Sequence, residues 1–449
     1  MRADNIGRSQ DNSLMTAPMS SRRHIAIFGA TNAGKSTLFN LLLGQEMSIV
    51  SSQHGTTTDP VIKSMELLDY GPIALIDTAG LNDKTELGNQ RVHRSRQMLS
   101  RSDAAIYVAD AVSWLKNSAL ADDYKLLCDD FEKHGIPHQL ILTKADILTE
   151  AEISKLTKSW PQSEQERLIL DLNKPDTALL LFPVLSRLLR MSDEMLAQAS
   201  AADNRSTNKE QISDSVIDGL VDAGDTVLMI VPIDSEAPKG RLILPQVQLI
   251  RDCLDHGVKC LVCRDDELED TIAEYGYSIK LAVTDSQAFA FAADKVPEHI
   301  PLTSFSMLLA AAKGDFPLML SGLKRIKQLK DGDAVLISEA CSHNSSHEDI
   351  GRVKLPAMLH KLTGANLKIE FSAGHSYPED LERYRLVVHC GGCMLTHRTM
   401  LSRVRYAADR QTAITNYGLL LAYGNGIIER STEIFRQKRQ LPVELTKGL

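Results

Sequence analysis

The sequence predicts an α/β protein built from three domains. Short apolar stretches of strand length alternate with helical patterns along most of the chain, which is typical of parallel sheets covered by helices. A polar stretch at residues 197–209, rich in Ala, Ser, Asn and Asp, separates the first α/β region from the rest. A length of 449 residues allows roughly two to four domains of ordinary size. We therefore expect domains at residues 23–192, 210–270 and 271–449, after a disordered tail at residues 1–22.

The composition of the chain indicates which partners and which cellular compartment are expected. The 50 Lys and Arg residues against 58 Asp and Glu residues argue against a protein whose main work is wrapping nucleic acid. No apolar run approaches the ~18–20 residues of a membrane span, and the first 23 residues lack the apolar core of a signal peptide. The seven cysteines are then expected to be reduced. We therefore expect a cytoplasmic protein that binds neither nucleic acid nor membrane.

The first domain opens with a phosphate-binding motif. The apolar strand at residues 24–28 runs into G-x-x-x-x-G-K-[ST] and then into a helical pattern, which is the context this motif requires. Backbone N–H groups of such a loop cradle phosphates, while Lys35 neutralises the β and γ oxygens and Ser36 binds Mg²⁺. The candidate nucleotide-binding residues of the loop are Asn32, Ala33, Gly34, Lys35, Ser36 and Thr37.

A second apolar strand ends at Asp77, shortly before Gly80. An acid and a glycine in this arrangement hold Mg²⁺ through water and sense the γ-phosphate of the nucleotide. Thr57 lies in the polar loop at residues 55–60, where its hydroxyl can complete the Mg²⁺ shell. We therefore expect Lys35, Thr57, Asp77 and Gly80 to take part in nucleotide hydrolysis.

A later strand ends in Thr143-Lys144-Ala145-Asp146, which resembles the NKxD guanine-recognition motif of small GTPases. The aspartate of that motif accepts two hydrogen bonds from the guanine edge, and adenine has no such donor pair. Asp146 therefore favours GTP over ATP, while Thr143 in place of Asn is expected to weaken base binding. Residues 182–186 are the best candidate for the turn that closes the base pocket, although their serine can equally cap a helix.

Residues 24 to about 190 resemble the translation-factor-related GTPases of the Era and TrmE type. Leu81 stands where Ras-like proteins carry a water-orienting glutamine, so the resemblance implies slow intrinsic hydrolysis. It also implies that Glu86 positions the attacking water. Asn32 matches the asparagine that offers an oxygen to K⁺ in potassium-activated members, and a simple turn preference is an equally good reading.

The middle region contains a small βαβ unit. Strands are predicted at residues 225–232 and 258–263, with a helix at residues 246–256 between them. About sixty residues are too few to bury both faces of a sheet, so we expect a homodimer through this segment. Cys260 and Cys263 have C-x-x-C spacing, but positions i and i+3 of a strand point to opposite faces, which favours core packing over ligation.

The C-terminal region contains a candidate metal site. Predicted strands at residues 333–340 and 384–388 lead into a Cys-x-His and a His-Cys-x-x-Cys motif, and parallel strands place such sites at their carboxyl edge. The candidate ligands are Cys341, His343, His389, Cys390 and Cys393. Zinc accepts three cysteines and one histidine, and an iron–sulfur cubane accepts three cysteines with a variable fourth ligand. Three thiolates on polar loops favour the iron–sulfur cluster.

The GTPase motifs, the segment at residues 234–246 and the terminal cysteine motifs together resemble the HydF family of [FeFe]-hydrogenase maturation GTPases, over nearly the whole chain. The resemblance implies a P-loop GTPase domain, a dimerisation domain and a cluster-binding domain. It implies a homodimeric scaffold that binds a [4Fe-4S] cluster and carries a diiron precursor from two radical-SAM maturases to the apo-hydrogenase. Cys341, Cys390 and Cys393 are then the cluster ligands, with His343 or His389 in the fourth position.

Two other functions fit parts of the sequence. An Era- or TrmE-like GTPase of tRNA or ribosome metabolism would carry a zinc module at its C-terminus, but we find no KH-type GxxG unit and the charge balance is acidic. A non-catalytic scaffold would use its GTP site only as a conformational sensor. The metal content of the purified protein separates the first of these from the iron–sulfur reading.

Overall fold

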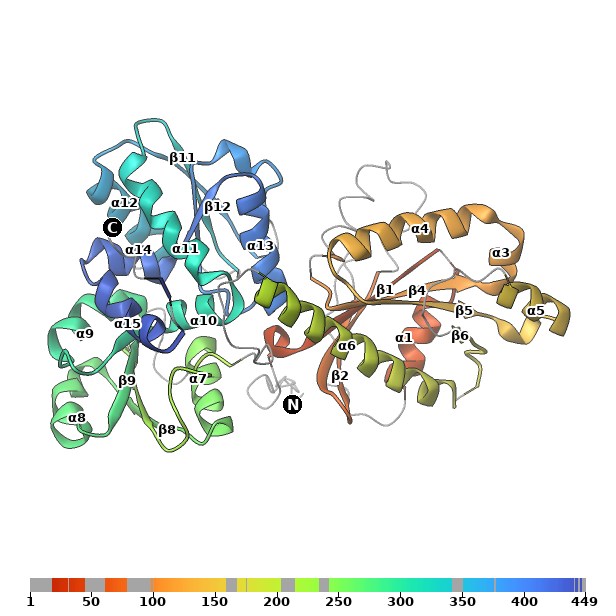
Figure 1. The fold of residues 1–449 in the computed structure, drawn as a ribbon, viewed down its shortest axis with the longest axis horizontal. Helices are drawn as coiled ribbons and strands as arrows, with labels where there is room; N and C mark the ends of the chain where they lie inside the picture. Colours follow the sequence, from red (N-terminus) through yellow and green to blue (C-terminus); the bar gives the residue numbers. More distant parts are fainter. Residues whose placement is uncertain are drawn as a thin grey trace, which may run out of the picture. The chain divides into compact units, whose positions relative to one another are not determined.

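A computed structural model gives the fold of the chain as two compact units, Met1–Ala199 and Ser200–Leu449 (Figure 1). The described residues are 18–30, 32–44, 61–78, 98–99, 101–158, 168–174, 176–202, 215–233, 242–340, 350–374, 377–439, 441–442 and 445. The predicted tail extends too far, because Met19–Ser21 form a 3-10 turn within the fold. Ser20 is buried, and the Met19 carbonyl accepts a hydrogen bond from the His24 ring (3.1 Å).

The first unit contains a six-stranded sheet of order β2-β3-β1-β4-β5-β6, in which only the β2–β3 pair is antiparallel. Its strands are β1 (Arg23–Gly29), β2 (Val61–Leu67), β3 (Gly71–Asp77), β4 (Ala104–Asp110), β5 (His138–Thr143) and β6 (Leu168–Ile169). Its helices are α1 (Lys35–Leu43), α3 (Ala111–Lys116), α4 (Ser118–Lys133), α5 (Glu150–Lys158) and α6 (Thr177–Ala202). The carboxyl ends of β1, β3 and β5 therefore point to the same edge of the sheet.

Both faces of this sheet are covered by helices. Ile25 and Ile27 belong to the core beneath α1 and α6, and Ala26 and Phe28 belong to the core beneath α3 and α4. Figure 1 shows α4 on one side of the sheet and α1 with α6 on the other. Because successive side chains of a strand point to opposite faces, a strand buried on both faces is apolar throughout, as residues 25–28 are.

The second unit contains two four-stranded parallel sheets, of order β10-β9-β7-β8 and β12-β11-β13-β14. The middle sheet comprises β7 (Thr226–Ile230), β8 (Lys259–Cys263), β9 (Ile279–Thr284) and β10 (Leu302–Ser304), with helices α7 (Leu244–Asp255), α8 (Leu268–Tyr275), α9 (Phe289–Lys295) and α10 (Phe305–Lys313). The C-terminal sheet comprises β11 (Ala334–Ser338), β12 (Lys368–Ser372), β13 (Leu386–His389) and β14 (Ala413–Asn416), with helices α11 (Phe316–Gly322), α12 (Leu355–Thr363), α13 (His397–Asp409), α14 (Tyr417–Gly424) and α15 (Ile428–Arg439). These sheets confirm the predicted α/β class.

The two sheets of the second unit repeat one topology. In each, the first strand lies between the second and the third, and the fourth pairs with the third. The first strands begin alike, because Asp225 and Asp333 each accept the N–H of the residue three positions before (2.9 Å) and each offer a carbonyl to the start of the second strand. The sequences Gly-Asp-Thr-Val-Leu at 224–228 and Gly-Asp-Ala-Val-Leu at 332–336 match this equivalence.

The predicted end of the middle domain at residue 270 falls inside the middle sheet. Both β9 and β10 follow that residue in the chain, and β9 pairs with β7 while β10 pairs with β9. Four strands of the same chain therefore build this sheet. The βαβ unit at residues 225–263 therefore does not need a second copy to complete its sheet, and its small size does not indicate a homodimer.

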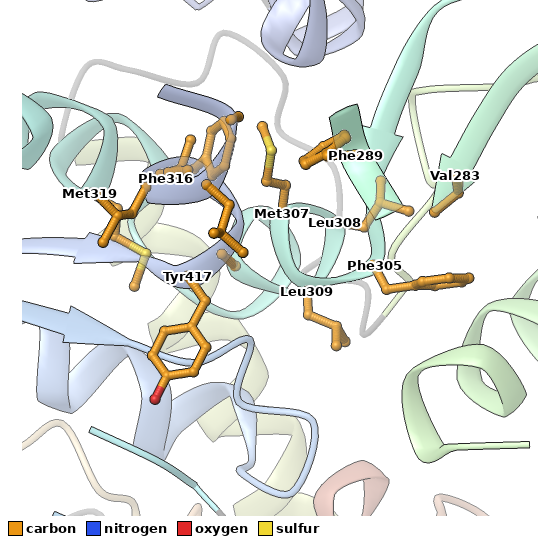
Figure 2. Packing of buried hydrophobic residues seen from close by; sticks show 14 of the residues in the cluster. Val283, Phe289, Phe305, Met307, Leu308, Leu309, Phe316, Met319 and Tyr417 are labelled. Carbon is orange, nitrogen blue, oxygen red and sulfur yellow. The ribbon is translucent and has the colours of Figure 1, made fainter. Parts of the chain in front are cut away.

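One core joins the two sheets of the second unit. Figure 2 shows Val283 of β9, Phe305 and Leu308 of α10, Met319 of α11 and Tyr417 of α14 packed in a single cluster of buried side chains. The chain returns to the middle sheet at its end, since α15 packs on β10. The Phe316 and Phe435 rings lie 4.7 Å apart, and the Arg430 guanidinium donates to the carbonyls of Ala293, Val296 and Pro297. The middle and C-terminal sheets therefore form one folding unit.

Candidate functional sites

The phosphate-binding loop connects β1 to α1 and begins at a glycine packed closely against β4. A Cβ atom on Gly29 would lie 2.0 Å from the Val108 carbonyl oxygen, so only glycine fits there. Asn32 has φ +62°, a left-handed conformation that asparagine tolerates better than most residues. This conformation explains an asparagine without any ion, and the K⁺ role of Asn32 stays a prediction. Ala33 is buried and Thr37 is exposed.

Lys35 and Asp77 bring opposite charges to the carboxyl edge of β1 and β3. The Lys35 ammonium is buried and donates to the carbonyls of Gly29 (2.9 Å) and Ala30 (2.8 Å). Burial lowers the pKa of Lys35, and the negative charge of Asp77 opposes that shift. Ser36 Oγ donates to Asp77 Oδ2 (3.2 Å). An ammonium and a hydroxyl at the start of α1, with a carboxylate at the end of β3, can bind a polyphosphate and a divalent cation.

Strand β5 is tied to this loop. Thr143 is buried, and its hydroxyl donates to the Ala33 carbonyl (2.7 Å), so β5 and the phosphate loop are held together by the residue that departs from the NKxD pattern. Lys144 follows with φ +59° and forms an ion pair with Asp110 at the end of β4. Thr57, Gly80 and Glu86 lie outside the described residues.

The predicted turn at residues 182–186 is wrong. These residues lie within α6, where the Ser186 hydroxyl donates to Asp69 Oδ1 (2.8 Å). The loop after β6 lies beside Asp146 instead, since the Leu170 carbonyl accepts the Ala145 N–H (3.3 Å) and Asn173 Nδ2 donates to Asp146 Oδ2 (3.4 Å). A two-residue strand leaves too weak a pattern to be recognised in the sequence, which is why this loop was missed.

The cysteine motif lies at the carboxyl edge of the C-terminal sheet, as the parallel strands predict. Strand β13 pairs with β11, with Ser338 opposite His389, and the Cys390 N–H donates to the Ser338 carbonyl (2.9 Å). Two backbone N–H groups point at the Cys390 sulfur, from Ala340 (3.1 Å) and from Gly392 (3.4 Å). Burial raises the pKa of the Cys390 thiol, while these N–H groups favour the thiolate and oppose the shift.

Cys393 lies in the same loop, three residues further on. Burial and the neighbouring Cys390 raise the pKa of the Cys393 thiol to about 11, and the positive charge of Lys313 opposes this shift. Gly392 has φ +68°, which lets the chain turn between the two cysteines. Two partly buried cysteines and two N–H donors directed at one of the sulfurs suit thiolate ligation of a metal.

His389 is engaged by the protein at both ring nitrogens. A carbonyl can only accept and a guanidinium can only donate, so Nδ1 carries the proton and donates to the Cys390 carbonyl (2.8 Å), while Nε2 accepts from Arg403 (3.1 Å). Burial and then the Arg403 charge lower the pKa of His389 to about 3. In this arrangement the neutral imidazole has no lone pair left for a metal, which disfavours His389 as the fourth ligand.

The remaining predicted ligands, Cys341 and His343, lie outside the described residues. Within the described part of the chain, no group of three or more His, Cys, Asp and Glu side chains is placed to hold a metal ion. Cys260 and Cys263 occupy β8, where Cys263 is buried in the core and the Cys260 thiol contacts Met229 Sδ (3.2 Å). Two residues that the sequence did not single out, Lys313 and Arg403, are buried cations beside the cysteine loop. A charged residue ending an apolar helical stretch, as in residues 305–313, is a signal that could have indicated Lys313.

Three family profiles match consecutive parts of the chain. Residues 24–144 match the 50S ribosome-binding GTPase profile. Residues 216–314 match the hydrogen maturase F dimerization domain, and residues 317–434 match the hydrogen maturase F tetramerization domain. The boundary between the last two coincides with the change from the middle sheet to the C-terminal sheet.

Curated relatives that are GTPases match about a third of the chain or less. GTPase Der of Kosmotoga olearia is 34% identical over 152 residues, which are 33% of this chain and 32% of that protein. The tRNA modification GTPase MnmE of Porphyromonas gingivalis is 36% identical over 129 residues, which are 28% of this chain and 26% of that protein. The chain therefore covers about a third or less of the length of these relatives. In the described residues, no helix has the length and apolar character needed to cross a membrane.

Proposed function

We propose that this chain, which belongs to the hydrogen maturase F family, is a GTP-hydrolysing scaffold that binds a [4Fe-4S] cluster and delivers a diiron precursor to apo-[FeFe]-hydrogenase. Two profiles of that family match its second unit, and a GTPase profile matches its first. The observation that carries the proposal is the Cys390–Cys393 loop at a sheet edge, with N–H groups aimed at the Cys390 sulfur, in a chain that also has a phosphate-binding loop.

GTP hydrolysis is assigned to the first unit. Lys35 binds the β- and γ-phosphates, and Ser36 and Asp77 hold Mg²⁺ directly and through water. Asp146 accepts hydrogen bonds from guanine, and Asn173, which contacts Asp146, closes the base pocket. Thr57, Gly80 and Glu86 keep the roles that the sequence predicts for them in the Mg²⁺ shell and around the attacking water.

The cluster is assigned to the C-terminal sheet. Cys390 and Cys393 hold it together with Cys341, the residue that follows Ala340 in the sequence. When bound, the cluster supplies an iron whose fourth position is exchangeable and can accept an incoming diiron unit. His343 is the better candidate for that fourth position, because both ring nitrogens of His389 are engaged. His389 and Arg403 instead orient the backbone around Cys390.

The partners follow from the same assignment. The dimerization and tetramerization profiles of the second unit support an oligomer, with a homodimer through the middle sheet as the simplest form. Two radical-SAM maturases supply the diiron precursor, and the apo-hydrogenase receives it. Mass measurement of the purified protein by light scattering tests the oligomer, and a monomer at micromolar concentration would contradict it.

Loss of the phosphate-binding lysine tests the GTPase assignment. Lys35→Ala should lower GTP turnover by roughly 100-fold or more, because it removes the charge that stabilises the transferring phosphoryl group. Iron content should stay at the wild-type level, since the cysteine loop belongs to the other unit. Lys125→Ala, an exposed lysine of α4, is the matched control and should leave turnover unchanged.

A transfer assay tests the carrier role. The chain is loaded anaerobically by the two maturases, re-isolated and mixed with apo-hydrogenase, and hydrogen evolution is measured. The proposal predicts activation by the wild-type chain and less than a tenth of it by Cys393→Ala. Equal activation by both proteins would remove the cysteine loop from the delivery step.

The alternative is a GTPase of tRNA or ribosome metabolism with a zinc-binding C-terminal region. Its support is that the curated relatives include tRNA modification GTPases. It predicts a colourless protein that sediments with ribosomes or binds tRNA in a salt-dependent manner. Ribosome or tRNA binding with no iron in the protein would favour this alternative.

A further inference from the structure

Lys313 is a buried lysine whose ammonium is directed at the cysteine loop. It is the last residue of α10 and is only 5% exposed. Its Nζ donates to the carbonyls of Leu395 (2.9 Å), Gly392 (3.4 Å) and Cys393 (3.4 Å). An ammonium has three donors, so one side chain can bind three carbonyls of a single loop.

The same helix contacts the loop at a second point. Gly391 lies so close to α10 that a Cβ atom on it would be 3.1 Å from Ser306 Cα and 3.2 Å from Ser306 Oγ. A third contact comes from α7, where Gln248 Nε2 lies 3.5 Å from the Cys393 carbonyl. The cysteine loop belongs to the C-terminal sheet, yet helices of the middle sheet hold it in place.

A second buried cation lies at the other end of the loop. The Arg403 guanidinium donates to His389 Nε2 (3.1 Å) and to the Gly374 carbonyl (2.7 Å), and it lies over the Tyr377 ring (5.0 Å). Lys313 thus places positive charge beside Cys393, and Arg403 places positive charge beside His389, the residue before Cys390. Thiolate ligands and the clusters they hold carry negative charge, which a buried site must offset.

We propose that Lys313 is a positioning residue for the cysteine loop: its ammonium fixes the loop by binding three carbonyls and offsets the negative charge of the thiolate ligands. The helix that carries it belongs to the region matching the dimerization domain. The ligand site of the C-terminal sheet therefore depends on the middle sheet for its shape and its charge. The charge part rests on the proposed cluster, whereas the clamp is a property of the metal-free chain.

Hydrogen–deuterium exchange of the metal-free, reduced full-length protein tests the clamp. Lys313→Met removes all three hydrogen bonds at nearly constant volume, and amides in residues 390–396 should exchange roughly tenfold faster or more. Amides of β13 should keep their wild-type rates, which distinguishes a released loop from a destabilised sheet. Lys295→Met is the matched control, because Lys295 ends α9 but pairs with an exposed acid, Glu269. Exchange within twofold of wild type in the loop would overturn the clamp.

The charge is tested separately with Lys313→Gln, which keeps N–H donors but has no charge. After anaerobic reconstitution with iron and sulfide, the midpoint potential of the cluster should move to a more negative value than in wild type, since a nearby positive charge stabilises the reduced form. An unchanged potential at wild-type iron content would overturn the charge role. If the wild-type chain itself takes up no cluster, the proposed function is wrong. The exchange rates of the metal-free protein then still show whether Lys313 holds the cysteine loop in place.

Discussion

The middle sheet and the C-terminal sheet share one strand order but differ at the end of the third strand. The pairing of that strand with the first makes Thr284 equivalent to His389, and hence Asp285 to Cys390 and Ser286 to Gly391. In the middle sheet a 3-10 turn at Ser286–Ala288 leads straight into α9. In the C-terminal sheet a glycine-containing loop with two cysteines precedes α13. Both sheets therefore have the same carboxyl edge, and they differ in the residues that lie there: a 3-10 turn in the middle sheet and a cysteine loop in the C-terminal sheet.

The two Cys-x-x-Cys pairs show the same point. Cys260 and Cys263 lie within strand β8, where a regular backbone sends one into the core and leaves the other half-buried. Cys390 and Cys393 have identical spacing but lie in a loop, where the turn at Gly392 and the N–H groups around Cys390 form a site for thiolates. Equal spacing therefore has different meanings on a strand and on a loop.

The largest expected effect is a loss of iron, and it tests the contrast between the two cysteine pairs directly. Cys390→Ser should reduce iron in the anaerobically purified protein from about four atoms per chain, the complement of one cubane, to less than about one. Cys260→Ser should keep the wild-type content, because that thiol packs against Met229. Iron analysis together with thermal unfolding of both variants measures this. Equal iron loss in the two would show that the strand pair also binds metal.

The next effect concerns the equivalent positions Gly391 and Ser286. Gly391→Ala places a methyl group against the backbone of α10 and should cost about 1–3 kcal/mol in the free energy of unfolding. Ser286→Ala creates no such contact and should change the free energy by less than about 0.5 kcal/mol. Urea denaturation of both variants tests the pair, and a tolerated alanine at 391 would contradict the close packing of loop and helix.

The pH dependence of stability should differ because His389 has no counterpart in the middle sheet. The pKa of His389 in the folded chain, about 3, is below its ordinary value of 6.5, so the unfolded chain binds one more proton between these limits. This contribution to stability is complete above about pH 6.5 and is lost as the pH falls toward 3, at about 1.4 kcal/mol per pH unit. The metal-free His389→Thr variant, which copies the middle sheet, should lose this slope between about pH 6.5 and 5. A slope equal to that of wild type would assign the acid sensitivity to other groups.

The smallest expected effect concerns a feature that the two sheets share, the aspartate before the first strand. Asp225→Ala and Asp333→Ala each remove an acceptor for one backbone N–H before the first strand, at the same distance. Each should cost about 1 kcal/mol, with the two values equal within about 0.5 kcal/mol. Asp333 also lies 3.6 Å from the largely exposed Arg385, a contact that adds little. A difference above 1 kcal/mol would mean that the two turns are not equivalent.

The sequence predicts the parts of this molecule that depend on local pattern. The phosphate-binding loop, the strand ending at Asp77 and the strands leading to Cys341 and His389 follow from apolar runs that end in polar or glycine residues. The sequence does not predict strand β6, because a strand of two residues is too short to show a hydrophobic period. The sequence also does not predict that β9 belongs to the middle sheet, because strand order depends on pairing between segments that are distant in the chain. The repeated Gly-Asp-x-Val-Leu at 224–228 and 332–336 would have indicated the two equivalent sheets.

The surroundings of the cysteines could not be predicted, because they come from residues far away in the chain. Lys313 reaches the loop from 79 to 82 positions earlier, and Ser306 is brought to Gly391 only by the packing of α10. Arg403 lies in α13 and donates a hydrogen bond to His389, which is 14 positions earlier in the chain. Motifs locate the cysteines, whereas tertiary packing supplies the charge and the hydrogen bonds around them.

Metal analysis of the wild-type protein, purified without exposure to oxygen, tests the central claim most directly. Iron and acid-labile sulfide are measured per chain, together with zinc and the visible spectrum. We expect a brown protein with about four iron and four sulfide per chain and no stoichiometric zinc. A colourless protein with about one zinc per chain and no sulfide would contradict it.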